Sequence, residues 1–130
     1  MNKQILIREI EAINWPDIPK EIVKTKSWDY RDAVDYFERF IAGQPVEMED
    51  LSYMMPTLTD KGLISLSPKI LQYCLMNPNS AVAPSLTSIL ENRFLAEHEG
   101  GKLSKEMKNL YQSFLIFISE LDDEGLPGGG

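Results

Sequence analysis

The chain has 130 residues, 43% of them hydrophobic, which suffices for one domain with one core. Its formal net charge of −7 argues against binding nucleic acid through phosphates, because that mode needs clustered Lys and Arg. A single cysteine allows no internal disulfide, and no apolar run approaches the roughly 20 residues of a membrane span. The start of the chain does not resemble an export signal, so we expect a cytoplasmic protein that binds neither nucleic acid nor membrane.

The N-terminal segment predicts one short amphipathic helix followed by an irregular stretch. The helix is expected from about Lys3 to Ile13, with Asn2 as its N-cap and apolar residues at helical spacing on one face. Pro16 and Pro19 end this pattern, because each removes an amide donor and restricts the residue before it. One more turn of helix is predicted over residues 20–26.

Acidic residues are concentrated between residues 29 and 50, where seven Asp or Glu and two Arg leave a charge of −5. A helix is predicted over Asp29–Ala42, with a broad apolar face, a polar face opposite it and Gly43 as its stop signal. A short helix that ends before Pro56 is predicted to follow. The acidic residues of these two helices and their connection form what we name the acidic face: Asp32, Asp35, Glu38, Glu47, Glu49 and Asp50.

Two more helices are predicted in the middle of the chain. Thr59 is the candidate N-cap of the first, within which Pro68 would either kink the helix or restart it. A turn signal at residues 77–80 separates it from the second, which is expected over residues 84–96. Pro84 stands at the first position of that helix, where its fixed φ is favourable.

The last predicted helix carries the most continuous apolar face of the sequence. It is expected from about Lys105 to Leu121, with Ser104 as its N-cap. Its core face consists of Leu103, Met107, Leu110, Tyr111, Phe114, Phe117, Ile118 and Leu121. No stretch alternates with a period of two, so we expect an all-α fold, a compact single-domain bundle of five to six helices packed around this helix. Residues 1–122 would form the domain, and residues 123–130 a flexible tail that is acidic and then Gly/Pro-rich.

Four motifs in the second half of the chain follow one another in a recognisable order: LTDKGL at residues 58–63, LSPKIL at 66–71, LSKEM at 103–107 and FLIFI at 114–118. Over roughly residues 55–120 this order resembles a family of small uncharacterised bacterial helical proteins, a domain of unknown function. Its members carry a Thr-Pro-Glu-Gly-like helix start, a Leu-Pro motif and a closing helix that ends in Phe-Leu-x-Phe-Leu. The resemblance implies a small helical domain without a catalytic assignment.

Few residues suggest a chemical reaction. Cys74 and His98 are the only obvious pair for nucleophilic catalysis, in which the imidazole would deprotonate the thiol. Cys74 lies on the apolar face of a predicted helix and His98 in a polar segment, a pattern typical of a buried thiol and a solvated imidazole. Glu97, His98 and Glu99 are adjacent and point apart, and no second His or Cys cluster completes a metal site. The three acids at residues 122–124 could attract calcium, but such a helix end is more typically hydrated. With no phosphate-binding loop or nucleophile elbow either, we expect no catalytic residue, no metal and no cofactor.

Three hypotheses for the function remain. The first is a non-catalytic protein that binds a basic protein partner through the acidic face, in its most specific form a bacterial immunity protein against a toxin. The same acids would also suit a surface that only keeps the protein dispersed. The second is a self-associating structural or adaptor protein that uses Ile116, on the polar side of the last helix, although single exposed isoleucines are ordinary. The third is an enzyme that uses Cys74 and His98, and the sequence does not indicate an oligomeric state.

Overall fold

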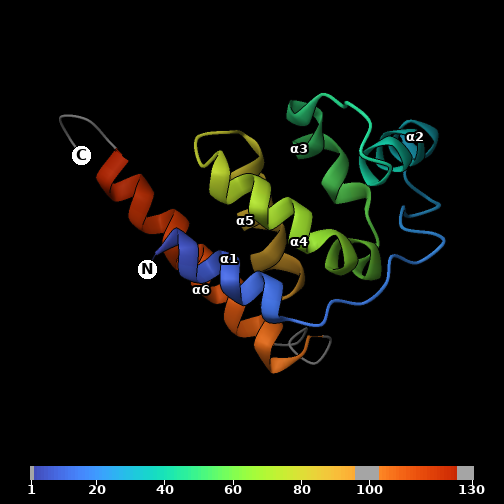
Figure 1. Cartoon of the computed structure of the whole chain (residues 1–130). Helices are drawn as coiled ribbons and strands as arrows, with labels where there is room; N and C mark the ends of the chain where they lie inside the picture. The colour runs from blue at the N-terminus through green and yellow to red at the C-terminus, as the bar shows by residue number, and fades with distance from the viewer. Residues whose placement is uncertain (1, 96–102, 126–130) are drawn as a thin grey trace. The chain divides into compact units, whose positions relative to one another are not determined.

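A computed structural model describes residues 2–95 and 103–125, with side chains up to Leu121. The fold is all-α, as predicted: the described residues form six α-helices, two short 3-10 helices and no strand (Figure 1). In chain order the elements are α1 (Lys3–Ala12), α2 (Tyr30–Ile41), η1 (Met48–Asp50), α3 (Leu51–Met54), η2 (Met55–Thr57), α4 (Asp60–Met76), α5 (Val82–Arg93) and α6 (Lys105–Gly125). None of the helices in these ranges is both long and apolar enough to cross a membrane.

The chain divides into two compact units. Unit 1 consists of Met1–Asn14 together with Pro68–Gly130, and unit 2 consists of Trp15–Ser67. The boundary between Ser67 and Pro68 falls inside α4, so each unit contains about half of that helix.

Unit 1 is built on α6, which contacts both α1 and α5. Figure 1 shows α1 lying along α6. Six of the eight residues predicted for the core face of α6 are buried, and Leu103 and Leu121 are partly buried. Ser104 caps the helix as predicted, since its Oγ accepts a hydrogen bond from the Met107 amide at 3.2 Å. The predicted end at Leu121 is wrong: α6 continues to Gly125, so the predicted start of the tail at residue 123 falls inside the helix.

The other helices of unit 1 follow the predicted pattern with shifted ends. Asn2 caps α1 as predicted, its Oδ1 accepting from the Gln4 amide at 2.7 Å. Helix α5 begins at Val82, two residues before the predicted start at Pro84. Proline is tolerated at any position of the first helical turn, because the backbone N–H groups there have no acceptor within the helix. The helix ends at Arg93, and Ala96 of the predicted range lies outside the described residues.

Unit 2 contains the one predicted helical turn that does not form. Residues 20–26 are not helical, and Val23 makes an isolated antiparallel bridge with Leu58. Two hydrogen bonds flank the bridge: the Lys24 amide donates to the Thr57 carbonyl at 2.7 Å, and the Thr59 amide donates to the Ile22 carbonyl at 2.8 Å. This pairing satisfies backbone groups that a helix would have satisfied locally, and it buries both Ile22 and Val23.

Helix α4 begins as the sequence predicts, with the Thr59 hydroxyl accepting from the Gly62 amide at 3.0 Å. Gly62 is needed there, because an added Cβ would lie 2.6 Å from the Ile22 carbonyl oxygen. The absent side chain is what lets the extended segment reach the helix. Pro68 lies inside α4, and the helix continues through it without restarting.

Candidate functional site

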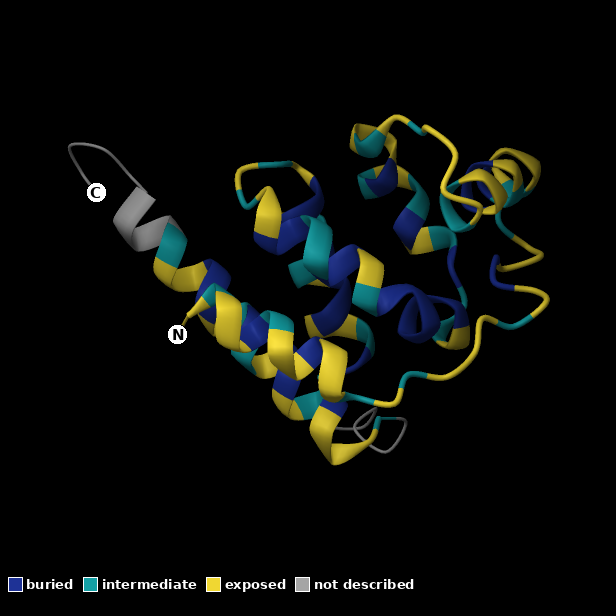
Figure 2. Ribbon diagram, viewed as in Figure 1, coloured by how far each residue is buried: buried dark blue, intermediate teal, exposed yellow. Residues whose placement is uncertain are grey.

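Helix α2 carries three of the predicted site residues on its exposed side. Asp32, Asp35 and Glu38 are all exposed. The opposite side of the helix is buried through Ala33, Tyr36 and Phe37, as its broad apolar face predicts. Figure 2 shows the exposed residues along α2 and along the segment that follows it. The orientation of these three carboxylates is therefore set by the burial of the apolar side.

The other three acids lie in the next segment, which one hydrogen bond ties to α2. The buried Tyr36 donates its hydroxyl to the Glu47 carbonyl at 2.9 Å. The same carbonyl accepts from the Asp50 amide at 3.1 Å, which closes the turn of η1. Leu51 and Met55, one turn apart and fully buried, anchor the following helices. Glu47, Glu49 and Asp50 remain exposed, so unit 2 presents all six residues of the acidic face to solvent.

The charges of the acidic face are not equivalent. Asp35 forms an ion pair with Arg39 one turn along α2. The hydrogen bond to Asp35, with the attraction between the two charges, raises the pKa of Arg39. In the part of the chain that the structure describes, the other five acids form no ion pair. We therefore expect Asp35 to contribute least to the negative field and the other five to dominate it.

Two exposed aromatic residues beside the acidic face were missed by the sequence reasoning. Trp28 is 94% exposed and Tyr53 is 78% exposed. Trp28 borders a hollow of about 320 Å³ that residues 29–32 also line, while Tyr53 lies one helical turn after Glu49. The sequence does contain a signal for Tyr53: on a helical wheel it lies about 180° from the centre of the Leu51 and Met55 face. Large exposed aromatics are typical of surfaces that bind proteins.

The remaining candidates are placed as follows. Cys74 is buried in the core of unit 1, and burial raises the pKa of its thiol to about 12. Its sulfur is therefore protonated at neutral pH and lacks the thiolate form that attacks substrates. His98, the other member of the hypothetical pair, lies outside the described residues. Ile116 belongs to unit 1 and is 52% exposed, as its position on the helical wheel predicts.

Neither the search for metal ligands nor the comparison with known proteins identifies a further functional site. In residues 2–95 and 103–121, no group of three or more His, Cys, Asp or Glu could hold a metal ion. Searches of the chain against known protein families, against functionally characterised proteins and against solved structures find no match. The resemblance of residues 55–120 to a bacterial family stays a prediction. The site is therefore defined by its own geometry: an exposed acidic face and two exposed aromatic residues on one unit.

Proposed function

We propose that this protein is a non-catalytic module that binds a basic protein partner through the acidic face. Its most specific form is a bacterial immunity protein that acts in the cytoplasm and blocks a toxin. The observation that carries the proposal is the exposure of six carboxylates on unit 2, on segments that a buried tyrosine connects. The two exposed aromatic residues of the same unit support it, because a surface that serves only solubility does not need them.

The two kinds of residue would contribute to different steps of binding. The five acids without an ion pair partner in the described structure produce a negative field that accelerates encounter with a basic protein. Trp28 and Tyr53 supply apolar area that becomes buried only in the complex. Charge reversal should therefore lower the association rate and its salt dependence, whereas truncation of the aromatics should raise the dissociation rate.

Capture of partners from an extract of the source organism tests the charge mechanism. The variant combines Asp32→Lys with Glu38→Lys, which avoids the Asp35–Arg39 pair. The matched control combines Glu11→Lys with Glu91→Lys, two exposed acids of unit 1 that change the net charge equally. A basic protein should be captured by the wild type and the control at low salt, and lost with the variant or at high salt. Capture that ignores both salt and the variant would contradict the proposal.

Kinetics with the captured protein test the aromatic residues. We expect Trp28→Ala and Tyr53→Ala each to raise the dissociation rate, by about tenfold or more where the side chain is a binding hot spot. Met76→Ala is the control, because Met76 is also an exposed large apolar residue but lies in unit 1. Unchanged dissociation rates for both aromatic variants would mean that only the acidic residues bind the partner, and would contradict the role proposed for Trp28 and Tyr53.

A further inference from the structure

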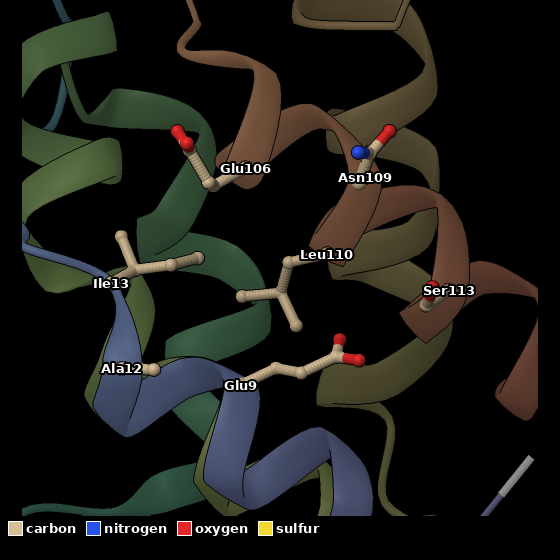
Figure 3. A pocket seen from close by; sticks show the side chains of 7 residues that line it. All are labelled: Glu9, Ala12, Ile13, Glu106, Asn109, Leu110 and Ser113. Atoms are coloured by element: carbon tan, nitrogen blue, oxygen red, sulfur yellow. The ribbon is translucent and has the colours of Figure 1, made fainter.

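A groove lies between α1 and α6 in unit 1, outside the acidic face. Its volume is about 300 Å³, and Leu110 and Ile13 provide apolar walls. Glu9 of α1 and Glu106 of α6 are its charged lining residues. Figure 3 shows Ile13 on the side of Glu106, and the Glu9 side chain reaching across toward Leu110 and Ser113. The two helices therefore run in opposite directions along the groove.

Each of the two helices that form this groove also carries an exposed isoleucine, Ile5 on α1 and Ile116 on α6. On a helical wheel, Glu106, Ser113 and Ile116 lie within one arc of about 80° on α6. Ile5 and Glu9 are one turn apart on α1. Because the helices are antiparallel, Ile5 and Ile116 both lie beyond the Glu9 end, where they are 47% and 52% exposed. The groove is thus lined by two acids, and each of its two helices carries one exposed isoleucine beyond Glu9.

We propose that the α1–α6 groove binds an amphipathic basic helix of another protein. Apolar side chains of that helix would cover Ile13 in the groove and the exposed side chains of Ile5 and Ile116 beyond it. Lys or Arg side chains beside them would pair with Glu9 and Glu106, their aliphatic stems lying on the apolar lining. This site is separate from the acidic face and does not depend on the function proposed for it.

The length of the groove side of α6 and the charge of the groove lining both favour a basic helix as the ligand. The segment of α6 from Glu106 to Ile116 is about 15 Å long, which matches about three turns of a docked helix. Both charged lining residues are acidic, so a complementary ligand carries positive charge. A second copy of this chain fits less well, because symmetric docking would bring two copies of this acidic groove together.

Titration of the labelled full-length protein with a synthetic peptide tests the proposal by NMR. The probe is a helical peptide of about 18 residues with Leu on one face and Lys beside it, and its control has Glu in place of Lys. The Lys peptide should shift the backbone signals of Ala12, Asn109 and Ser113, and the Glu peptide should not. Shifts confined to residues 28–53 would show that the acidic face takes such ligands and would overturn the assignment to the groove.

Matched variants separate the groove from general electrostatic attraction. Glu9→Lys combined with Glu106→Lys should weaken peptide binding by about tenfold or more, and Glu11→Lys combined with Glu91→Lys by much less. Ile116→Glu should also weaken it, whereas Met76→Glu, at another exposed apolar site of unit 1, should not. Equal losses in test and control variants would overturn the proposal.

Sedimentation of the protein alone distinguishes the competing occupant. A monomer at high concentration agrees with a groove that receives a foreign helix. A dimer that Ile116→Glu dissociates would overturn the proposal and assign the groove to a second copy of the chain.

Discussion

The two units of this protein both bury apolar side chains, but they differ in how their segments are connected. Unit 1 consists of helices whose apolar faces are buried, with Leu110, Tyr111 and Phe114 of α6 almost completely buried. Unit 2 also buries apolar side chains, such as Phe37 and Leu51, but its segments are in addition connected over long sequence separations by backbone and tyrosine hydrogen bonds. The buried face of a helix can be predicted from the periodicity of its apolar residues. A hydrogen bond between distant segments depends on the positions of single atoms, which no sequence pattern gives.

This difference bears on function. The acidic face belongs to the unit in which specific hydrogen bonds fix the segments, so its six acids lie on a defined surface. The α1–α6 groove belongs to the unit in which apolar packing dominates, and its lining combines apolar and acidic residues. Four predictions test this difference between the two units, and they are given from the largest expected change in stability to the smallest.

The largest effect is expected from a cavity in unit 1. Phe114→Ala should lower the free energy of unfolding by about 3–5 kcal/mol, because it removes a buried ring from the packed face of α6. Urea unfolding followed by circular dichroism measures the loss. Ile116→Ala, on the exposed side of the same helix, should change stability by less than about 0.5 kcal/mol. Similar losses for both would refute the assignment of α6 as a one-sided core helix.

The next effect should come from a single added methyl group in unit 2. Gly62→Ala would place a Cβ 2.6 Å from the Ile22 carbonyl oxygen, which also accepts the hydrogen bond from the Thr59 amide. Despite the higher helix propensity of Ala, we expect a net loss of about 1–3 kcal/mol. Lys61→Ala, at the preceding exposed position, is the control and should be nearly neutral. A more stable Gly62→Ala variant would rule out the close approach.

The pH dependence of the free energy of unfolding tests whether the thiol of Cys74 is buried away from water. The thiol has an ordinary pKa of 9.0, and burial raises its pKa to about 12 in the folded protein. Between these values the unfolded chain loses the proton first, so the free energy of unfolding falls by up to about 1.4 kcal/mol per pH unit. Below pH 9 the thiol is protonated in both the folded and the unfolded chain, so its contribution to the free energy of unfolding is fully present. Urea titrations at pH 8 and pH 10 should show this loss, and Cys74→Ala should lack the part due to the thiol.

Native thiol reactivity gives a second readout of the same burial. Cys74 should react with a thiol reagent at pH 8 only after denaturation. Rapid reaction of the folded protein would contradict the burial of the sulfur and reopen the hypothesis of a reactive cysteine.

The smallest effect should follow from removing one hydroxyl group. Tyr36→Phe keeps the buried ring but deletes the hydrogen bond to the Glu47 carbonyl, and should cost about 1 kcal/mol. The Asp50 amide, which donates to the same carbonyl, should exchange its hydrogen faster because η1 loses its connection to α2. Tyr53→Phe is the control, since that hydroxyl is on an exposed residue. Unchanged exchange at Asp50 would mean that the tyrosine does not hold the acidic segment.

Part of the candidate site could be read from the sequence. The spacing of Asp32, Asp35 and Glu38 opposite an apolar stripe predicts their exposure, and the structure confirms it. The position of Ile116 on the helical wheel likewise predicts an exposed side chain. The exposure of Trp28 could not be predicted, because that residue precedes α2 and has no helical phase.

By itself the sequence determined the all-α class and which residues of α1, α2 and α6 face the core, because helical periodicity is a local property of the chain. Only the tertiary structure decided that residues 22–24 pair with residues 57–59 instead of forming a helical turn, that Gly62 accommodates Ile22 and that Tyr36 holds Glu47. Each of these features joins groups that are more than ten residues apart in the chain, and their free energy exceeds the weak local preference for a helical turn.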